Sequence, residues 1–434
     1  MSVAPPTVLV IGAGAAGLSA ARALRRAGVR TVILEARERT GGRVDTRQDP
    51  SLGIPRERGA EFVHGRPKTV TALAREAGVP IVRVPSSHRV AARKGRESAG
   101  ARFAKAWALF DLARDDRESV AALFARARRE RRARAPELSL ARSFAEGFYL
   151  ADPNTASAAA LSRMNRALET IGGDQNYRPL FGWASVLAPL AAEARRPPAE
   201  LRLGVTATRV RWRPGAVAVE ARGLAGGSLP VLRGERLLLT VPLGVLRGGG
   251  IQFRPEPDSA RSAWGRLDMG PVVKVLLRFR RPPWEERGRG GFAFLHLPGA
   301  PVPVFWTLAP RRDPLLVGWV GGPGARRLSG LGESGALRAA LRGLAPALGL
   351  ATGALEDRLD GAELVDWSRD PLSGGGYAVF PVGSAGASEA LSRPILGTLF
   401  FAGEATEPDF AGTVDGALRS GERAARQVLE SLPG

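Results

Sequence analysis

Apolar positions near the start of the chain predict a strand, a helix and a second strand in close succession. Val8–Ile11 is a short apolar run of the strand type, and apolar residues then recur at helical spacing from Leu18 to Leu24. Gly28 ends this predicted helix. The apolar run Val29–Leu34 predicts the second strand, which leads into Glu35. Such a unit is typical of a parallel sheet whose strands are joined by helices.

Beyond this unit the pattern changes twice. Residues 97–195 are rich in Ala, Leu and Arg at helical spacing, with few β-branched runs, and predict a helical insertion. Strand-type runs follow, with a helix predicted at residues 333–348 and another after the last strand. The predicted strands are Leu201–Ala221, Leu237–Pro242, Val272–Phe279, Phe292–Leu297, Val302–Leu308, Leu315–Val320 and Leu399–Glu404.

We therefore expect an α/β fold in which a Rossmann-type nucleotide-binding domain is interwoven with a substrate domain of mixed sheet and helices. Residues 1–85, 200–260 and 385–434 are assigned to the nucleotide-binding domain. Residues 86–199 and 261–384 are assigned to the substrate domain. The chain then crosses between the two domains more than once.

The glycines after the first strand predict a site for a dinucleotide. Gly12, Gly14 and Gly17 have the GxGxxG spacing. Such glycines allow a tight turn, close approach of the backbone to a pyrophosphate, and close packing of helix on strand. The helix N-terminus then presents free N–H groups to phosphate, and a carboxylate at Glu35 can accept hydrogen bonds from a ribose. Ala16 and Ala36, next to these residues, are also expected to contact the cofactor.

The residues after Glu35 distinguish between two candidate cofactors. Arg37 precedes the glycine pair Gly41 and Gly42, which is followed by Arg43. A nicotinamide site does not call for a second glycine pair and basic cluster here. This segment resembles the GG-doublet flavoproteins of the GR2 type, in which such a loop grips the FAD pyrophosphate. The resemblance therefore favours FAD over NAD.

A compact loop further on strengthens the resemblance. Gly59, Ala60, Glu61 and Phe62 precede His64 in a segment similar to the loop that touches the isoalloxazine ring in flavin amine oxidases. The resemblance places His64 near the substrate pocket of the polyamine-oxidase branch. A purely structural role for this histidine stays open.

Lys274 lies inside the apolar strand Val272–Phe279, in a chain that otherwise uses arginine. Burying a lysine costs several kcal/mol unless it is paired or hydrated. One alternative is an edge strand with Lys274 pointing outward. The resemblance instead implies a strand lysine that holds a water against flavin N5.

The last third of the chain resembles two further segments of the superfamily. Trp367 and Tyr377 match a region in which monoamine oxidases carry a flavin-linked cysteine; Gly376 stands at the cysteine position, which excludes that link. Thr413 stands where monoamine oxidases have a second tyrosine and the polyamine oxidases and histone lysine demethylases have threonine. In the middle of the chain we expect Ala207 and Val241 to contact the cofactor. In the last third the expected cofactor contacts are Trp367, Gly403, Glu404, Gly412, Thr413, Val414 and Ala417.

Composition narrows the alternatives. The chain has no cysteine, which excludes disulfides and thiolate metal sites, and its three histidines are scattered, so we expect no metal centre. No apolar run reaches about 18 residues, and residues 1–6 lack signal-peptide features, so we expect a cytoplasmic protein. The net charge of +21 admits a nucleic-acid partner. We favour arginines spread over the surface, because Arg126–Arg134, the densest basic stretch, contains no aromatic residue.

The motifs span residues 8–417 and imply a member of the flavin-containing amine oxidase superfamily. The implied reaction passes a hydride from an amine C–H to flavin N5, gives an imine that hydrolyses, and reduces O2 to hydrogen peroxide. An L-amino-acid oxidase on the same fold is one alternative and would need an arginine for the substrate carboxylate. A second alternative is a desaturase or protoporphyrinogen-type oxidase, but Lys274 and Tyr377 argue against it. A non-catalytic flavoprotein with a basic nucleic-acid-binding surface is the third alternative.

Overall fold

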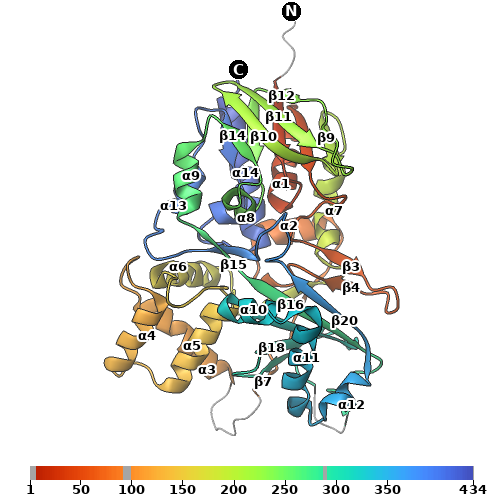
Figure 1. Ribbon diagram of the computed structural model, residues 1–434, viewed down its shortest axis with the longest axis vertical. Helices are drawn as coiled ribbons and strands as arrows, with labels where there is room; N and C mark the ends of the chain where they lie inside the picture. Colours follow the sequence, from red (N-terminus) through yellow and green to blue (C-terminus); the bar gives the residue numbers. More distant parts are fainter. Residues whose placement is uncertain (1–5, 91–98, 287–290, 434) are drawn as a thin grey trace, which may run out of the picture.

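The computed structural model describes residues 6–90, 99–286 and 291–433 (Figure 1). Its N-terminal part has the predicted strand, helix and strand, as β1 (Thr7–Ile11), α1 (Ala15–Arg26) and β2 (Arg30–Glu35). Gly28 follows the helix with φ of 76°, a left-handed conformation that glycine adopts without strain. This part of the sequence prediction is confirmed.

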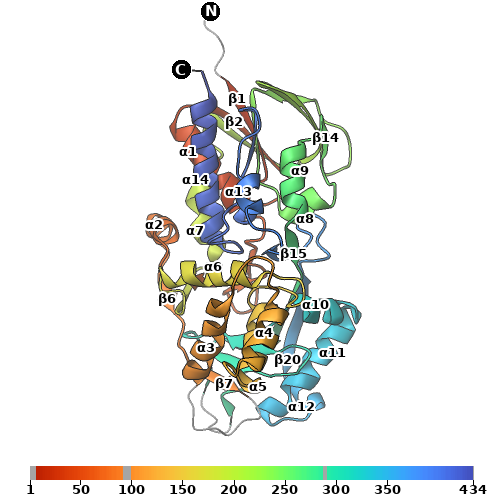
Figure 2. The ribbon, with the colours of Figure 1, turned by 90° about the vertical axis from the view of Figure 1, so that its left-hand side faces the viewer.

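The upper half in Figure 1 is built on a parallel sheet of five strands in the order β22-β13-β1-β2-β9. Its other strands are β22 (Leu399–Phe401), β13 (Arg236–Leu239) and β9 (Ala199–Leu203). One face packs on α1, which lies beside α14 (Val414–Ser431) and α7 (Trp183–Glu193) (Figure 2). The other face packs on the antiparallel strands β10 (Thr206–Arg213) and β11 (Ala216–Arg222). Both faces are buried, which explains the continuous apolar runs of β1 and β13.

The lower half contains a sheet of six strands in the order β20-β16-β19-β18-β17-β7. These strands are β20 (Leu359–Asp366), β16 (Val272–Phe279), β19 (Leu315–Gly321), β18 (Val304–Thr307), β17 (Phe294–His296) and β7 (His88–Val90). Val273 and Val275 point to one face, which packs on α10 (Gly322–Ser329) and α11 (Gly332–Leu344). Val272 and Leu276 point to the opposite face.

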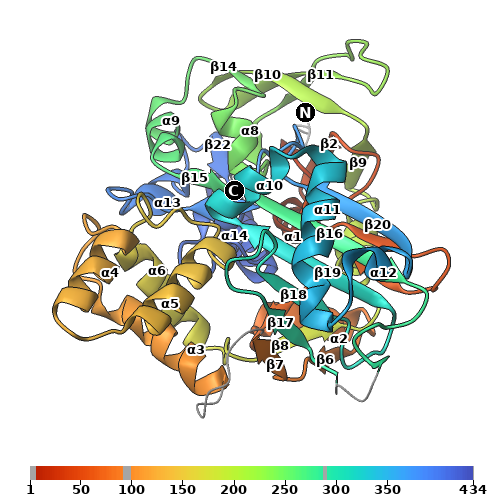
Figure 3. The same ribbon diagram turned by 60° about the horizontal axis from the view of Figure 1, so that its bottom comes forward.

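A bundle of helices lies beside this sheet (Figure 3), and its helix α5 contacts α10. It consists of α3 (Ala99–Ala108), α4 (Val120–Arg129), α5 (Ala135–Gly147) and α6 (Ala158–Glu169). The strand β8 (Asn176–Pro179) interrupts the region expected to be helical and pairs with β5 (Val63–His64) and β6 (Ile81–Arg83). Asparagine and proline are poor strand formers. The pairing partners, far away in the sequence, therefore determine the conformation of β8.

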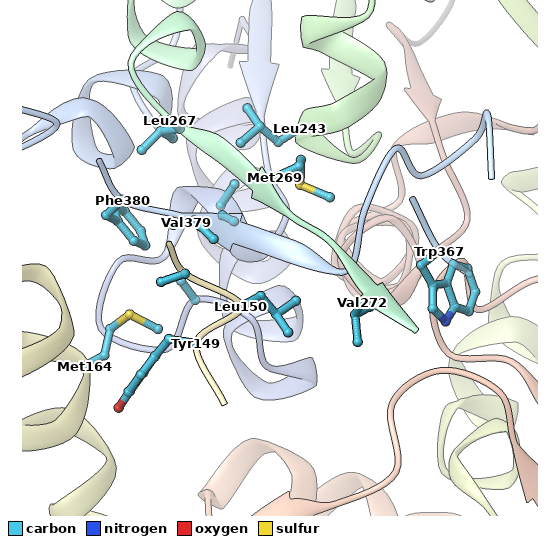
Figure 4. Close-up of a cluster of buried hydrophobic side chains, with 14 of the residues drawn as sticks. Tyr149, Leu150, Met164, Leu243, Leu267, Met269, Val272, Trp367, Val379 and Phe380 are labelled. Carbon is cyan, nitrogen blue, oxygen red and sulfur yellow. The ribbon is translucent and has the colours of Figure 1, made fainter. Parts of the chain in front are cut away.

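Two short strands connect the halves. β15 (Asp268–Gly270) leads directly into β16 and pairs with β21 (Tyr377–Val379). Apolar side chains from both halves gather around this pair, and Figure 4 shows Leu150, Val272 and Trp367 among them. The two halves therefore share one apolar core at this crossing point.

The remaining elements are shorter or lie at the periphery. They are β3 (Thr46–Gln48), β4 (Pro55–Glu57), α2 (Lys68–Glu76), β12 (Leu232–Gly234), α8 (Leu243–Arg247), β14 (Gln252–Arg254), α9 (Asp258–Gly265), α12 (Thr352–Glu356) and α13 (Ala387–Leu391). Within the described ranges, no helix is both long and apolar enough to cross a membrane.

Candidate active site

One cavity of about 510 Å³ runs from the N-terminus of α1 to the six-stranded sheet. Every residue that the sequence analysis assigned to a site lines this cavity, with one exception. Gly17 lies behind it, where a Cβ atom would be 1.9 Å from the Gly12 carbonyl oxygen. This position therefore allows α1 to pack closely on β1, as the sequence predicts for the third glycine.

The first turn of α1 is open toward the cavity. Gly14 is the N-cap and provides no side-chain cap, and the first turn has no acidic residue. Ala15 and Ala16 line the cavity. The N–H groups of a first helical turn have no partner within the helix, and the helix dipole favours an anion there. This end of the cavity fits a phosphate.

Glu35 lies at the end of β2 and is 6% exposed. Its two carboxylate oxygens accept hydrogen bonds from the backbone N–H groups of Ala13, at 2.7 Å, and Arg37, at 2.9 Å. Each oxygen keeps a further lone pair, and the side chain lines the cavity. The carboxylate is therefore held rigidly and can accept a hydrogen bond from a hydroxyl group.

We expect Glu35→Ala to weaken binding of a dinucleotide by about 1–3 kcal/mol, because its hydroxyl partner is left unpaired. Glu35→Gln is the matched control, since it keeps an acceptor at one oxygen position. Fluorescence of released cofactor measures the dissociation constant. An unchanged constant for the alanine variant would show that the carboxylate holds no hydroxyl.

The glycine pair is fixed by a buried carboxylate. Gly14 and Gly41 form a parallel bridge, which places the pair against the start of α1. The Arg43 guanidinium donates to the Gly376 carbonyl, at 2.7 Å, and to Glu404 Oε1, at 2.8 Å. Glu404 Oε2 also accepts from the N–H of Gly412, at 2.9 Å. Glu404 therefore links the segment that contains Arg43 to the segment around Gly412, and both segments line the cavity.

Lys274 lies on β16, an interior strand between β20 and β19, and is completely buried. The alternative of an edge lysine pointing to solvent is wrong. Its Nζ donates to the carbonyl oxygens of Glu57, at 2.8 Å, and Gly59, at 3.1 Å, and to Glu61 Oε2, at 2.8 Å. An ammonium has three donors. In this structure all of them are used, so a water bridge to a flavin would have to replace one of these contacts.

Glu61 connects Lys274 to two residues that the sequence did not indicate. Its Oε1 accepts from the Arg178 guanidinium and from Trp306 Nε1, both at 2.8 Å. Burial alone would raise the pKa of this carboxyl, but Lys274 and Arg178 outweigh burial and hold the pKa below its ordinary value. Glu61 is therefore an ionised carboxylate at the floor of the cavity.

Glu57 lies four residues before Glu61 and is also a buried carboxyl, but its pKa is raised rather than lowered. Burial raises its pKa from 4.5 to about 7, although it accepts from the Trp183 N–H and the Thr46 hydroxyl. The folded protein holds its proton more tightly than the unfolded chain does. The stabilising contribution of this group is therefore complete below pH 4.5 and is lost as the pH rises to about 7.

We expect Glu57→Gln to remove this pH dependence. Relative to the variant, the wild type should lose up to about 3 kcal/mol of unfolding free energy between pH 4 and pH 8. Urea unfolding at both pH values measures the difference. Parallel pH profiles for the two proteins would show that Glu57 titrates normally.

Tyr377 closes the cavity beside the crossing strands. Its hydroxyl donates to the carbonyl oxygen of Phe148, and its ring lies against Gly412, where a Cβ atom would approach to 2.8 Å. Burial raises the pKa of the phenol far above its ordinary value, so it stays protonated. At the neighbouring Gly376 a Cβ atom would lie 2.6 Å from Leu150 and 2.7 Å from Val272, which are both labelled in Figure 4.

The N-terminus of α14 also reaches the cavity. The Thr413 hydroxyl accepts from the Gly416 N–H at 2.9 Å, which makes Thr413 the N-cap of this helix. Val414 opens the helix and lines the cavity together with Ala417. A threonine at this position therefore has a structural use as a cap.

All three histidines line the cavity. The Nδ1 of His64 is 2.8 Å from Asn176 Oδ1, and burial lowers the His64 pKa, so the ring is neutral at pH 7. His88 and His296, which the sequence analysis left without a role, lie at the sheet end. Aromatic side chains make up much of the wall there: Phe62, Phe103, Phe144, Phe148, Phe294, Trp306 and Trp319.

Comparison with known proteins agrees with this geometry. A model of the flavin-containing amine oxidoreductases matches residues 15–110 and 93–429. The chain belongs to the flavin-containing amine oxidoreductase family. The sequence prediction of the family is confirmed.

The relatives of this amine oxidoreductase are named either as polyamine oxidases or as lysine-specific histone demethylases. Polyamine oxidase 2 of Arabidopsis thaliana is 27% identical over 99% of this chain and 90% of its own length. Lysine-specific histone demethylase 1 homolog 1 of Oryza sativa subsp. japonica is 28% identical over 99% of this chain and 53% of its own length. The chain therefore spans about half the length of that demethylase.

Solved structures of amine oxidases share the fold. Cyclohexylamine oxidase from Brevibacterium oxydans IH-35A has a TM-score of 0.80 at 23% identity, covering 98% of this chain and 99% of its own. Wild-type putrescine oxidase bound to putrescine has a TM-score of 0.80 at 22% identity, with the same coverage. The mixed α/β fold with a Rossmann-type nucleotide-binding domain is confirmed.

Proposed function

We propose that this chain binds FAD without a covalent link and oxidises an amine at the carbon beside its nitrogen, with O2 as the final acceptor. The products are an imine, which water converts to an aldehyde or ketone, and hydrogen peroxide. Bound FAD supplies the two-electron oxidation of the C–H bond and the reaction with O2. The residues of the chain supply binding, orientation and exclusion of water.

The observation that carries this proposal is the continuity of the cavity. The open N-terminus of α1, the Glu35 carboxylate and the N-terminus of α14 fit a dinucleotide at one end. Lys274, Tyr377 and His64 lie farther along the same cavity. A cofactor held at the first end can therefore place its ring beside these side chains. If the chain divides into the two domains given above, the ring of the cofactor lies at the junction between them.

The sheet end of the cavity suits an amine with an apolar body. Phe62 contacts Phe294 and Trp306, with ring centroids 5.8 and 5.2 Å away. Glu61 lies against these rings, and Lys274 and Arg178 already neutralise it. Two further carboxylates of the cavity, Asp409 and Asp415, are paired with Arg163 and Arg419. A substrate with several positive charges therefore finds no free carboxylate among the described residues of this wall. This favours a monoamine over a polyamine.

The amino-acid oxidase alternative lacks its key residue. Arg37 and Arg43 are the arginines among the described residues that line the cavity. Arg37 is paired with Asp370, at 2.9 Å, and Arg43 with Glu404, at 2.8 Å, and both lie beside the glycine pair. No described arginine of the cavity is free to bind a substrate carboxylate at the sheet end.

We expect acid precipitation to release all of the flavin into the supernatant. Gly376 carries no sulfur, the chain has no cysteine elsewhere, and Leu150 and Val272 fill the space that a side chain at this position would need. The visible absorbance of pellet and supernatant measures the partition. Flavin retained in the pellet after proteolysis, as a peptide adduct, would contradict a non-covalent site.

Anaerobic mixing of the holoenzyme with a panel of amines and L-amino acids tests the function. Bleaching of the flavin by a monoamine, followed by peroxide release on adding air, is the expected result. Bleaching by amino acids alone would establish the amino-acid oxidase instead. No bleaching by any compound, together with salt-sensitive binding of DNA, would favour the non-catalytic flavoprotein with a basic surface.

A further inference from the structure

Leu150 lies in the turn that ends α5 and has a left-handed backbone conformation, with φ of 53°. The Ala151 N–H donates to the Ala145 carbonyl oxygen, at 2.9 Å, and closes this turn around Leu150. Glycine is the usual residue at such a position, because a Cβ atom is strained there. Leu150 is nevertheless a branched residue, and it is 1% exposed. The turn itself therefore does not explain why a leucine stands here.

Three glycines surround the Leu150 side chain (Figure 4). They are Gly270 in β15, Gly321 at the end of β19 and Gly376 just before β21. A Cβ atom at these positions would lie 2.3, 2.4 and 2.6 Å, respectively, from a carbon of Leu150. None of the three glycines has a positive φ, so their backbone conformations do not require glycine. Leu150 therefore fills a slot that three separate segments leave open for its side chain.

The residues just before Leu150 hold two rings of the cavity wall. The Gly147 carbonyl oxygen accepts a hydrogen bond from Trp319 Nε1, at 2.6 Å, and the Phe148 carbonyl oxygen accepts one from the Tyr377 hydroxyl. Phe148 itself contributes a third ring to the wall. All three rings line the cavity, whereas Leu150 lies behind them. The place of this short segment therefore determines the place of three rings in the cavity.

We propose that Leu150 is a positioning residue for the amine, because it fixes these three rings and thereby determines the width of the pocket. The proposal rests on the proposed amine oxidation for the identity of the ligand. Protein interiors are closely packed, so the Leu150 side chain cannot move without displacing one of the glycine segments. Leu150 does not line the cavity. It acts on the amine only through the rings of Phe148, Tyr377 and Trp319.

Truncation of Leu150 should loosen the wall without changing any group that lines the cavity. Neighbouring side chains relax partly into the space that a truncated core residue leaves. Phe148 is two residues from Leu150, and Tyr377 directly follows Gly376, one of the slot glycines. These two rings are therefore expected to move away from the amine. A narrow amine should lose its contacts with both rings, whereas a wider amine should still reach them.

Fluorine NMR of the holoenzyme labelled with 3-fluorotyrosine tests the positioning role without any substrate. The chain has three tyrosines, Tyr149, Tyr177 and Tyr377, so three resonances can be assigned with phenylalanine variants. In Leu150→Ala the Tyr377 resonance should shift or split. The Tyr177 resonance should not change, because Tyr177 belongs to a different buried cluster.

Leu267→Ala is the matched control for this truncation. Leu267 is a completely buried leucine of the same apolar core, and it precedes β15 (Figure 4). The control should lower the stability of the protein, because it also removes buried apolar atoms. It should leave the Tyr377 resonance in place. A comparison of the two variants therefore separates loss of stability from displacement of the rings.

Titration with an amine that cannot be oxidised tests the effect on the pocket. 2-Phenyl-2-propylamine has no hydrogen on the carbon beside its nitrogen, and flavin absorbance reports its binding. Its dissociation constant should rise about tenfold in Leu150→Ala, the effect of two weakened aromatic contacts. The constant of its wider 4-tert-butyl analogue should change less than twofold. Leu150→Met, which has nearly the same volume, should restore the wild-type constants, and FAD should stay bound in every variant.

The outcomes separate this inference from the proposed function. An unmoved Tyr377 resonance, or equal effects of Leu150→Ala and Leu267→Ala on amine affinity, would overturn the positioning role. Leu150→Gly removes the side chain together with the backbone strain, and it serves if the alanine variant does not fold. A displaced resonance in a holoenzyme that no amine binds or bleaches would remove amine oxidation and leave Leu150 as the residue that fixes the rings. Bleaching by amines with unchanged dissociation constants in Leu150→Ala would do the reverse.

Discussion

Replacing Lys274 by methionine should slow the reoxidation of the reduced, flavin-saturated enzyme by roughly a hundredfold, the order seen when one preorganised electrostatic contact is lost. The variant keeps the apolar stem and removes the charge. It should also lose about 3–5 kcal/mol of unfolding free energy, because one partner of a buried ion pair is removed. Glu61 then keeps only Arg178 as a counter-charge. Rapid mixing with O2 and urea unfolding measure the two effects.

Glu61→Gln is the matched control for this variant. It removes the buried negative charge and keeps one acceptor oxygen, which can serve Lys274 or Trp306 but not both. If Lys274 acts directly on the reaction with O2, the control should reoxidise close to the wild-type rate. Equal slowing in both variants would show that Lys274 acts by holding the loop from Glu57 to Glu61. A normal rate in Lys274→Met would leave the lysine with a structural role alone.

Replacing Tyr377 by alanine should raise the dissociation constant of the best amine substrate by about two- to tenfold, the value of a lost aromatic contact. Flavin reduction should also slow, because the amine is held less firmly, while FAD stays bound. Tyr377→Phe is the control: it loses only the hydrogen bond to Phe148 and keeps the ring against Gly412. Anaerobic stopped-flow measurement gives both constants.

Wild-type reduction kinetics in Tyr377→Ala would place the substrate elsewhere in the cavity. Thr413→Tyr, which adds an opposing ring, should narrow the range of accepted amines. That variant also loses the N-cap of α14. Its unfolding free energy must therefore be measured beside its substrate range, because a lost cap costs about 1 kcal/mol by itself.

The sequence predicted those parts of the fold that local patterns determine. The β1-α1-β2 unit and strand β16 appear where the apolar runs place them. The strand β8 was missed, because pairing with β5 and β6 determines its conformation and two of its four residues, Asn176 and Pro179, are weak strand formers. The glycine and GG-doublet motifs were visible because their residues lie close together in the chain.

The ion pairs of Glu61 with Lys274 and Arg178 could not be predicted in the same way, and neither could the contact between His88 and His296. Arg178 lies 117 residues from Glu61, and His88 lies 208 residues from His296. Nothing around Arg178 or His88 distinguishes either from other residues of its type. Tertiary pairing alone brings these partners together. The one local signal was Lys274, a lysine within an apolar strand.

The parallel sheet has a consequence for the order of events during synthesis. Its strands come from residues 7–35, 199–239 and 399–401, and α14 packs directly on α1. Contacts so distant in sequence form slowly, because long loops must close first. The glycine-rich turn emerges early from the ribosome together with β2 and Gly41, but β13, its other neighbour in the sheet, follows only after more than half of the chain. Capture of the cofactor is therefore a late step of biogenesis, and chains interrupted before residue 399 have no complete nucleotide-binding sheet.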